Sequence, residues 1–227
     1  TIVVFTSDNG GVSAGDGKAT SNLPYRGGKG RQWEGGIREP YYIKWPNSPV
    51  NGTTIDTPVT GTDFFPTLLD LVGIPLMPEQ HMDGVSLMPL LAGKKIEDRA
   101  LFWHYPHYSN QRGDPSTVIR DGDWKLIYYH EDRHIELYHL KNDLGEHVDL
   151  AGNYPALEKE LLEKLLDWTV EVDAKFPTEN PNFSSQVFEA ERRKTRLIDK
   201  PALEKQHAQV LDPNWSPKGG WWEETGN

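Results

Sequence analysis

A chain of 227 residues with 36% hydrophobic and 11% aromatic content can bury a substantial core, which excludes an intrinsically disordered protein. No apolar run approaches the length of a membrane-spanning helix, and the absence of cysteine excludes disulfides, thiolate metal sites and a cysteine nucleophile within these residues. The net charge of −10 argues against a nucleic acid partner, because a polyanion needs an extended basic face.

The first forty residues hold the side chains best suited to chemistry. The apolar run Ile2-Val3-Val4-Phe5 predicts a strand buried on both faces, as in a parallel sheet covered by helices. Asp8 and Asn9 follow it, at the carboxyl end of the strand where open α/β sheets place their sites. Their oxygens suit Ca²⁺ or Mg²⁺, although Asp-Asn-Gly-Gly is also common turn chemistry, and spacing alone favours the turn.

A glycine-rich basic loop follows, between Arg26 and Arg38. Lys29 lies among its glycines, which allow the ammonium group and nearby backbone N–H groups to approach an anion closely. Such a cation can bind a sulfate or phosphate oxygen and stabilise the charge that develops on it. The alternative is a solvated, flexible loop, and the ending of a nucleotide-binding P-loop is missing.

The rest of the front part contains three further element patterns. Tyr41 to Pro46 predicts a second strand, and Asp63 is expected to cap a helix over residues 64–72 that ends at Gly73. Gly84 to Lys95 predicts a short helix or loop. Together with the first strand, these elements indicate an α/β layer with a mainly parallel sheet over residues 1–98.

From Arg99 the pattern changes to short strands separated by turns rich in Gly, Asp and Asn. Such strands in succession indicate an antiparallel sheet, so we expect a boundary near residue 98. An amphipathic helix over Pro155–Phe176 is expected to cover one face of the sheet. Residues 177–227 predict a tail that wraps the body, with a charged helix over 189–196 and a tryptophan pair near its end. The strand candidates cover residues 100–105, 117–120, 124–129 and 135–140.

The segment from Trp103 to Tyr108 combines two histidines with four aromatic rings. Its imidazoles can hydrogen-bond a sugar on which the rings stack, and His107 is the candidate substrate contact. Histidines that are simply satisfied within an aromatic cluster are the more frequent case.

Several of these motifs, taken in order, resemble the later part of the sulfatase family within the alkaline phosphatase-like superfamily. The resemblance extends from Thr1 to about Leu150, and its order along the chain makes it more specific than any one motif. The motifs are Ser7–Gly11, Tyr25–Gly30, Glu34–Pro40, Thr62–Leu68, Asp83–Leu87, Arg120–Leu126 and Glu136–Tyr138 with Asn142–Asp143.

The resemblance implies a fold and a partial site. The fold would be the C-terminal part of an alkaline phosphatase-like α/β sandwich, followed by a small antiparallel sheet with a long packed helix. Asp8 and Asn9 would be two ligands of a Ca²⁺ (or Mg²⁺) ion, and Lys29 would be a catalytic residue that contacts the sulfate group. His107 would border the substrate pocket.

One part of the family pattern is absent. Sulfatases use a formylglycine nucleophile made from a C/S-x-P-x-R motif, which these residues lack. We therefore expect them to be the C-terminal portion of a sulfatase, with the nucleophile and remaining metal ligands before Thr1 and no activity alone. The resemblance implies a periplasmic or secreted parent protein. A sulfated carbohydrate substrate and self-association through surfaces that the missing part would cover are further expectations.

Two alternatives remain open from the sequence. One is a phosphatase or phosphonate hydrolase of the same superfamily. The other is a non-catalytic carbohydrate-binding accessory module that acts through its loops.

Overall fold

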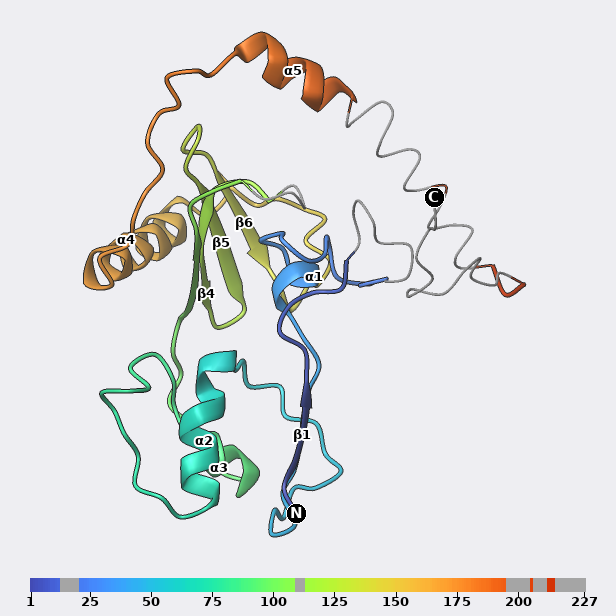
Figure 1. Cartoon of the computed structure of the whole chain (residues 1–227), viewed down its shortest axis with the longest axis vertical. Coiled ribbons are helices and arrows are strands. Elements are labelled where there is room, and N and C mark those ends of the chain that lie inside the picture. Colours follow the sequence, from blue (N-terminus) through green and yellow to red (C-terminus); the bar gives the residue numbers. More distant parts are fainter. Residues whose placement is uncertain (13–20, 109–112, 195–204, 206–211, 215–227) are drawn as a thin grey trace, which may run out of the picture.

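The computed structural model describes residues 1–12, 21–108, 113–194, 205 and 212–214 (Figure 1). Within this part of the chain no helix is long and apolar enough to cross a membrane. The elements in chain order are β1 (Val3–Thr6), α1 (Glu34–Ile37), β2 (Tyr41–Lys44), η1 (Gly61–Asp63), α2 (Phe64–Leu71), α3 (Met88–Leu91), β3 (Leu101–Tyr105), β4 (Ser116–Asp121), β5 (Trp124–Tyr129), β6 (Ile135–His139), α4 (Pro155–Glu171) and α5 (Ser185–Lys194).

Four strands form an antiparallel sheet in the order β3-β4-β5-β6, which confirms the strands and the antiparallel sheet predicted from the sequence. The register pairs His104 with Thr117 and Ile119 with Leu126. Strands β4 and β5 are joined by a two-residue turn in which Gly122 has a φ of 57°. Glycine accepts this left-handed conformation without a steric penalty, so the turn sets the register of the hairpin.

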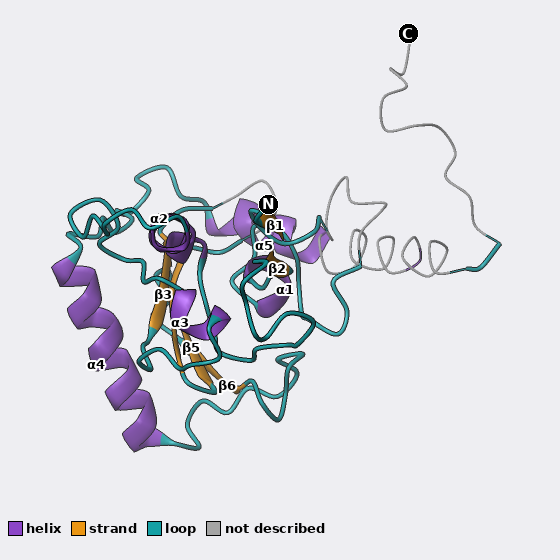
Figure 2. Ribbon diagram, turned by 90° about the horizontal axis from the view of Figure 1, so that it is seen from below, coloured by secondary structure: helices purple, strands orange, loops and turns teal. Residues whose placement is uncertain are grey.

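The sheet separates two apolar clusters because successive side chains of a strand point to opposite faces. On one face, Ile119 and Leu126 pack with Leu165 of α4. On the other face, Val118 and Ile127 belong to a cluster against which Trp33, beside α1, packs. Figures 1 and 2 show the same arrangement, with α4 on one side of the sheet and α1 on the other.

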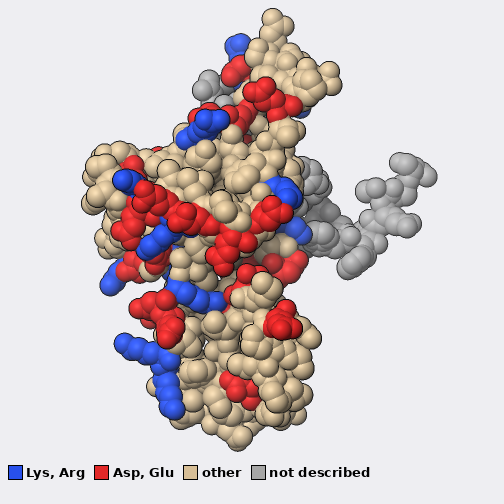
Figure 3. Space-filling model, turned by 90° about the vertical axis from the view of Figure 1, so that its left-hand side faces the viewer, with Lys and Arg blue, Asp and Glu red and all other residues tan. Residues whose placement is uncertain are grey.

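Helix α4 covers the sheet as the apolar stripe in the sequence predicts. It begins at Pro155, whose missing N–H costs nothing in the first turn, and it ends at Glu171 rather than at the predicted Phe176. The reason for the earlier end is a reversal at Asp173, which has a φ of 49°. Figure 3 views the molecule from the side on which α4 lies and shows acidic and basic side chains interspersed there.

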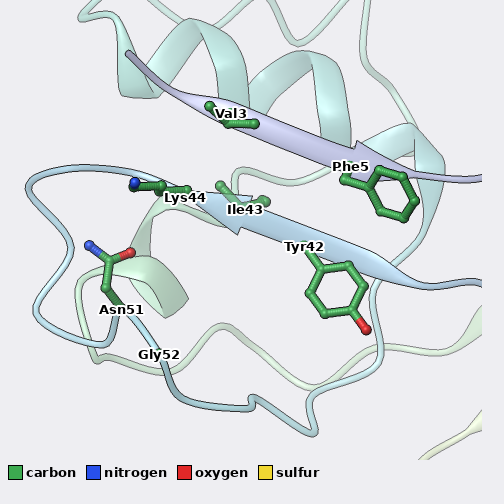
Figure 4. Close-up of a pocket in the computed structure, with 7 residues that line it drawn as sticks. All are labelled: Val3, Phe5, Tyr42, Ile43, Lys44, Asn51 and Gly52. Carbon is green, nitrogen blue, oxygen red and sulfur yellow. The ribbon is translucent and has the colours of Figure 1, made fainter.

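The first strand differs from the expectation in its pairing and in its burial. Strand β1 pairs with β2 in antiparallel register, and these two strands form a separate sheet. Val3, Phe5 and Tyr42 lie on one face of this sheet and are 52%, 65% and 66% exposed. The prediction of a parallel strand buried on both faces was wrong for the described chain, because no described element covers this face. The exposed face borders the shallow pocket in Figure 4, lined by Val3, Phe5, Tyr42, Ile43, Lys44, Asn51 and Gly52.

Helix α2 begins where the sequence predicts, but Asp63 does not cap it with its side chain. The buried carboxylate of Asp63 accepts instead from the N–H groups of Thr60 and Val85 and pairs with Arg99. It therefore holds three separate segments together. The preceding 3₁₀ turn η1 carries a capping box formed by Thr60 and Asp63.

The last described helix, α5, begins at Ser185 and overlaps the charged helix predicted over residues 189–196. The tryptophan pair at 221–222 lies outside the described residues. The division of the chain near residues 98 and 176, and the wrapping tail after 177, stay predictions.

Candidate functional site

The two loops that carry the candidate residues cross each other. Strand β1 ends at Thr6, and the loop after it is bonded to the basic loop at two points. Gly10 N–H donates to the carbonyl of Gly36 over 3.1 Å, and Lys29 N–H donates to the carbonyl of Gly11 over 3.0 Å. The structure thus brings Asp8-Asn9 and Lys29 onto adjoining backbone, while their roles as metal ligands and sulfate contact stay predictions.

Glycines make this crossing possible. At the crossing, a Cβ atom on Gly10 would lie 2.1 Å from the carbonyl oxygen of Gly35, and within the basic loop one on Gly36 would lie 2.1 Å from that of Arg31. Both distances are far below van der Waals contact, and the obstructing atoms belong to backbone. Only glycine allows these backbones to approach so closely.

Asp8 and Asn9 lie at the end of β1 with their side chains together. The Asn9 amide donates to Asp8 Oδ2 over 2.6 Å, and the Asp8 side chain is exposed. A carboxylate and an amide oxygen are the hard donors that Ca²⁺ and Mg²⁺ prefer, so their chemistry fits such an ion. No group of three or more His, Asp or Glu able to hold a metal occurs among the described residues, and the pair supplies only part of a shell.

Lys29 lies half-buried at the middle of the basic loop. Gly27 and Gly30 on either side have φ values of 76° and 79°, so the loop turns sharply around the lysine. Within the described part of the chain, the Lys29 ammonium has no ion-pair partner. It is therefore a positive charge available to an anion.

A buried ion network joins this loop to the four-stranded sheet. The Lys125 ammonium lies 2.8 Å from Glu146 Oε1 and 3.1 Å from Glu34 Oε1. The exposed fractions of Glu34, Lys125 and Glu146 are 1%, 0% and 0%. Burial raises the pKa of Glu146, and the charge of Lys125 opposes that change. Two arginines lie near the other carboxylate, that of Glu34. Arg38 Nη1 is 3.6 Å and Arg120 Nη1 is 3.7 Å from Glu34 Oε2, and both add positive charge there.

Arg26 attaches the beginning of the loop to the same region. Its Nη1 donates to the hydroxyl of Tyr138 over 2.8 Å and to the backbone carbonyl of Glu146 over 3.0 Å. Its guanidinium carbon lies 3.8 Å from the ring centroid of Trp33. This stacking and the two hydrogen bonds fix the side chain on three sides.

A second polar network lies on the same face of the sheet. Gln32 donates to the hydroxyl of Tyr129 over 2.7 Å, while that hydroxyl and the Trp33 indole N–H both donate to Glu136 Oε2 over 2.9 Å. Burial, followed by the charge of Glu136, raises the pKa of Tyr129. The tyrosine therefore stays a neutral donor at all ordinary pH values.

His107 is exposed in the loop after β3, and its ring centroid lies 4.0 Å from that of Tyr105. Nearby, the hydroxyl of Tyr108 donates to Glu131 over 2.7 Å, and burial first and this contact second raise the tyrosine's pKa. None of the described hydrogen bonds, ion pairs or ring contacts joins His107 to Lys29 or Asp8. Its place at the substrate pocket stays a prediction.

From the sequence alone, no role follows for the three residues of the buried ion network. Glu34 and Lys125 lie in motifs that carry the family resemblance, whereas Glu146 lies outside these motifs, in the segment between β6 and α4. A charged residue inside an otherwise apolar strand, such as Lys125 in Trp-Lys-Leu-Ile, is a signal for a buried pair. The sequence alone carries no signal for its partners, which lie far away along the chain.

Comparisons with known proteins show which family this chain resembles. The family model described as N-sulphoglucosamine sulphohydrolase, C-terminal, matches residues 29–171. A sulfatase of Formosa agariphila is 37% identical over 190 residues, which cover 77% of this chain and 34% of that protein. Human arylsulfatase A is 32% identical over 187 residues, which cover 73% of this chain and 36% of its own length.

A solved structure of a protein in complex with its substrate D-glucosamine-2-N,6-O-disulfate superimposes with a TM-score of 0.60 and 27% identity, covering 78% of this chain and 35% of that one. The chain thus spans about a third of the length of these relatives. The predicted family resemblance and fold class are confirmed. On the family match and the level of identity, the chain belongs to the sulfatase family.

Proposed function

We propose that the whole protein hydrolyses sulfate esters of a carbohydrate and that this chain supplies one side of its active site. The observation that carries the proposal is the crossing of the two loops, which bonds the backbone of Lys29 to the loop that carries Asp8 and Asn9, while the Lys29 ammonium has no ion-pair partner among the described residues. Family membership supports the reaction class.

Lys29 has the properties required to bind the sulfate group. Lys29 is a half-buried cation on a loop whose backbone is held by hydrogen bonds, and an ionic hydrogen bond is stronger there than in bulk water. As the S–O bond breaks, negative charge develops on the leaving and peripheral oxygens, and a cation already in place stabilises that charge. Asp8 and Asn9 would hold Ca²⁺ or Mg²⁺, which when bound supplies further neutralisation of sulfate oxygens.

The carbohydrate part of the proposal is supported by two observations. One relative in structure was solved with a disulfated glucosamine as its substrate. In this chain, Tyr105 at the end of β3 and His107 in the loop after it form an exposed ring pair, and such a pair can stack on a sugar while the imidazole hydrogen-bonds a hydroxyl.

The test is an assay of the full-length protein on matched sulfate and phosphate esters of glucosamine and of a phenol. We expect turnover of the sulfate esters, and a loss of about 10²- to 10³-fold in kcat/KM on Lys29→Ala. The matched control is Lys44→Ala, which removes an exposed lysine of β2 and should leave kcat/KM unchanged. Phosphate esters as the better substrates would identify a phosphatase, and sugar binding without any turnover would identify an accessory module.

A further inference from the structure

We infer that Glu146 is a positioning residue that holds the basic loop at two points, Arg26 and Glu34, on either side of Lys29. This inference rests on the proposed function, since it concerns the same loop. It assigns a role to a buried residue that has no described hydrogen bond or ion pair with Asp8, Asn9 or Lys29.

At the beginning of the loop, Glu146 acts through its backbone. Its carbonyl accepts a hydrogen bond from Arg26 Nη1 over 3.0 Å, and Glu146 itself has a left-handed backbone conformation with a φ of 51°. The arginine is held in addition by Tyr138 of β6. The first residue of the loop is thereby attached to the sheet.

Further along the loop, Glu146 acts through its side chain. Its Oε2 accepts the backbone N–H of Glu34 over 2.6 Å, which is the short distance of an ionic hydrogen bond. Next to it, Gly35 N–H donates to the carbonyl of Arg26 over 2.8 Å and closes the base of the loop. One residue therefore holds residues 26 and 34, and Lys29 lies between them.

The network that surrounds Glu146 keeps its carboxylate in one place. Lys125 lies 2.8 Å from Oε1 of Glu146 while Oε2 accepts from the loop, so the two oxygens have separate tasks. Burying these charges is costly, and apolar side chains of the same volume would pack the interface at least as well. What apolar residues would not provide is a directional acceptor for the Glu34 N–H.

Movement of the loop would be passed on to the other candidate residues. Lys29 N–H is bonded to the carbonyl of Gly11, and Gly36 is bonded to Gly10. The clamp at Glu146 thus sets the position of Lys29 directly and that of the Asp8-Asn9 loop through these two hydrogen bonds.

The experiment measures hydrogen exchange of the peptides covering residues 26–36 in the full-length protein, by mass spectrometry. Glu146→Ala removes the side-chain clamp, and Glu146→Gln removes only its charge and keeps its shape. We expect exchange in these peptides to rise about tenfold in the alanine variant and by less in the glutamine variant. The matched control is Leu165→Ala, which destabilises the opposite face of the sheet without touching the loop.

Unchanged exchange over residues 26–36 in both Glu146 variants would overturn the inference. So would an equal rise in Leu165→Ala, because the effect would then follow global stability alone. In the sulfate-ester assay, Glu146→Ala should lower kcat/KM at least about tenfold, with little further loss when combined with Lys29→Ala. If Lys29→Ala leaves turnover unchanged while loop exchange still rises in Glu146→Ala, the clamp is supported and the proposed role of Lys29 is refuted.

Discussion

At the level of single residues, two lysines show how burial changes the contribution of an ion pair to stability. Lys125 is 0% exposed and lies between the carboxylates of Glu34 and Glu146. The side chain of Lys164 on α4 is 45% exposed and pairs with Asp121 and Glu160, each over 2.8 Å. The ion pairs of the two lysines are similar in length, but solvent screens those of Lys164.

The two lysines should therefore respond differently to removal of their charge. Lys125→Met should lower the free energy of unfolding by about 3–5 kcal/mol, because it removes the cation between two buried carboxylates and leaves Glu146 without an ion-pair partner among the described residues. Lys164→Met is the matched control and should cost less than about 1 kcal/mol. Urea unfolding of both variants at neutral pH measures the difference, and equal losses would show that the Lys125 network contributes no more than a surface pair.

The residues differ in how far the sequence could identify them. Asp8, Asn9 and Lys29 can be proposed from the sequence because each lies within a short motif whose chemistry is evident locally. Glu146 was not found, since its contacts with Arg26 and Glu34 join residues 120 and 112 positions apart. Such contacts depend on the fold, and a single sequence contains no local pattern that encodes them.

At the level of elements, a chain of polar contacts attaches the segment after α4 to the sheet. His104 on β3 lies 2.7 Å from the hydroxyl of Thr117 on β4, which lies 2.9 Å from His130 after β5. The other ring nitrogen of His104 donates to the carbonyl of Lys175 over 2.8 Å. Phe176 packs edge-on against both histidine rings.

This arrangement predicts that the folded chain becomes less stable in mild acid. Burial, followed by the neighbouring His104, lowers the pKa of His130 below its ordinary value. The unfolded chain, with a histidine pKa of about 6.5, then binds the proton more readily than the folded chain. The contribution of neutral His130 to the stability of the folded chain is complete above about pH 6.5. It is lost as the pH falls through the lower pKa that His130 has in the folded state.

The measurement is the urea midpoint between pH 7.5 and pH 5, above the range in which aspartates protonate. The midpoint should fall toward pH 5, and His130→Asn should flatten that slope. His147→Asn is the control, because His147 is exposed and lies outside this cluster. A slope that His130→Asn leaves unchanged would assign the acid sensitivity to other groups.

Elements with a regular pattern were predicted best. Strands β3 to β6 follow from short strand-forming runs separated by turn residues, and helix α4 follows from an apolar stripe that packs against one face of the sheet. The pairing of β1 could not be derived in this way. Four apolar residues in succession are compatible with a strand covered on both faces or on one, and only the arrangement of neighbouring elements distinguishes the two.

At the level of the whole molecule, apolar surface is distributed unevenly. The four-stranded sheet is covered on one face by α4 and on the other by the cluster beside α1 (Figures 1 and 2). The sheet of β1 and β2 has an open face instead, on which Phe5 and Tyr42 lie side by side with ring centroids 6.1 Å apart. Among the described strands, β1 and β2 pair only with each other.

Exposed apolar faces and unpaired strand edges promote association, so the 227-residue chain should self-associate. Sedimentation velocity over a hundredfold range of concentration should show oligomers that dissociate on dilution, and the double substitution Phe5→Ser with Tyr42→Ser should shift the chain toward the monomer. Met82→Ser is the matched control, because Met82 is 85% exposed but lies between α2 and α3, away from this sheet. A monomer at every concentration would contradict the prediction. An equal effect of the control would show that association depends on exposed apolar area in general and not on the open face of β1 and β2.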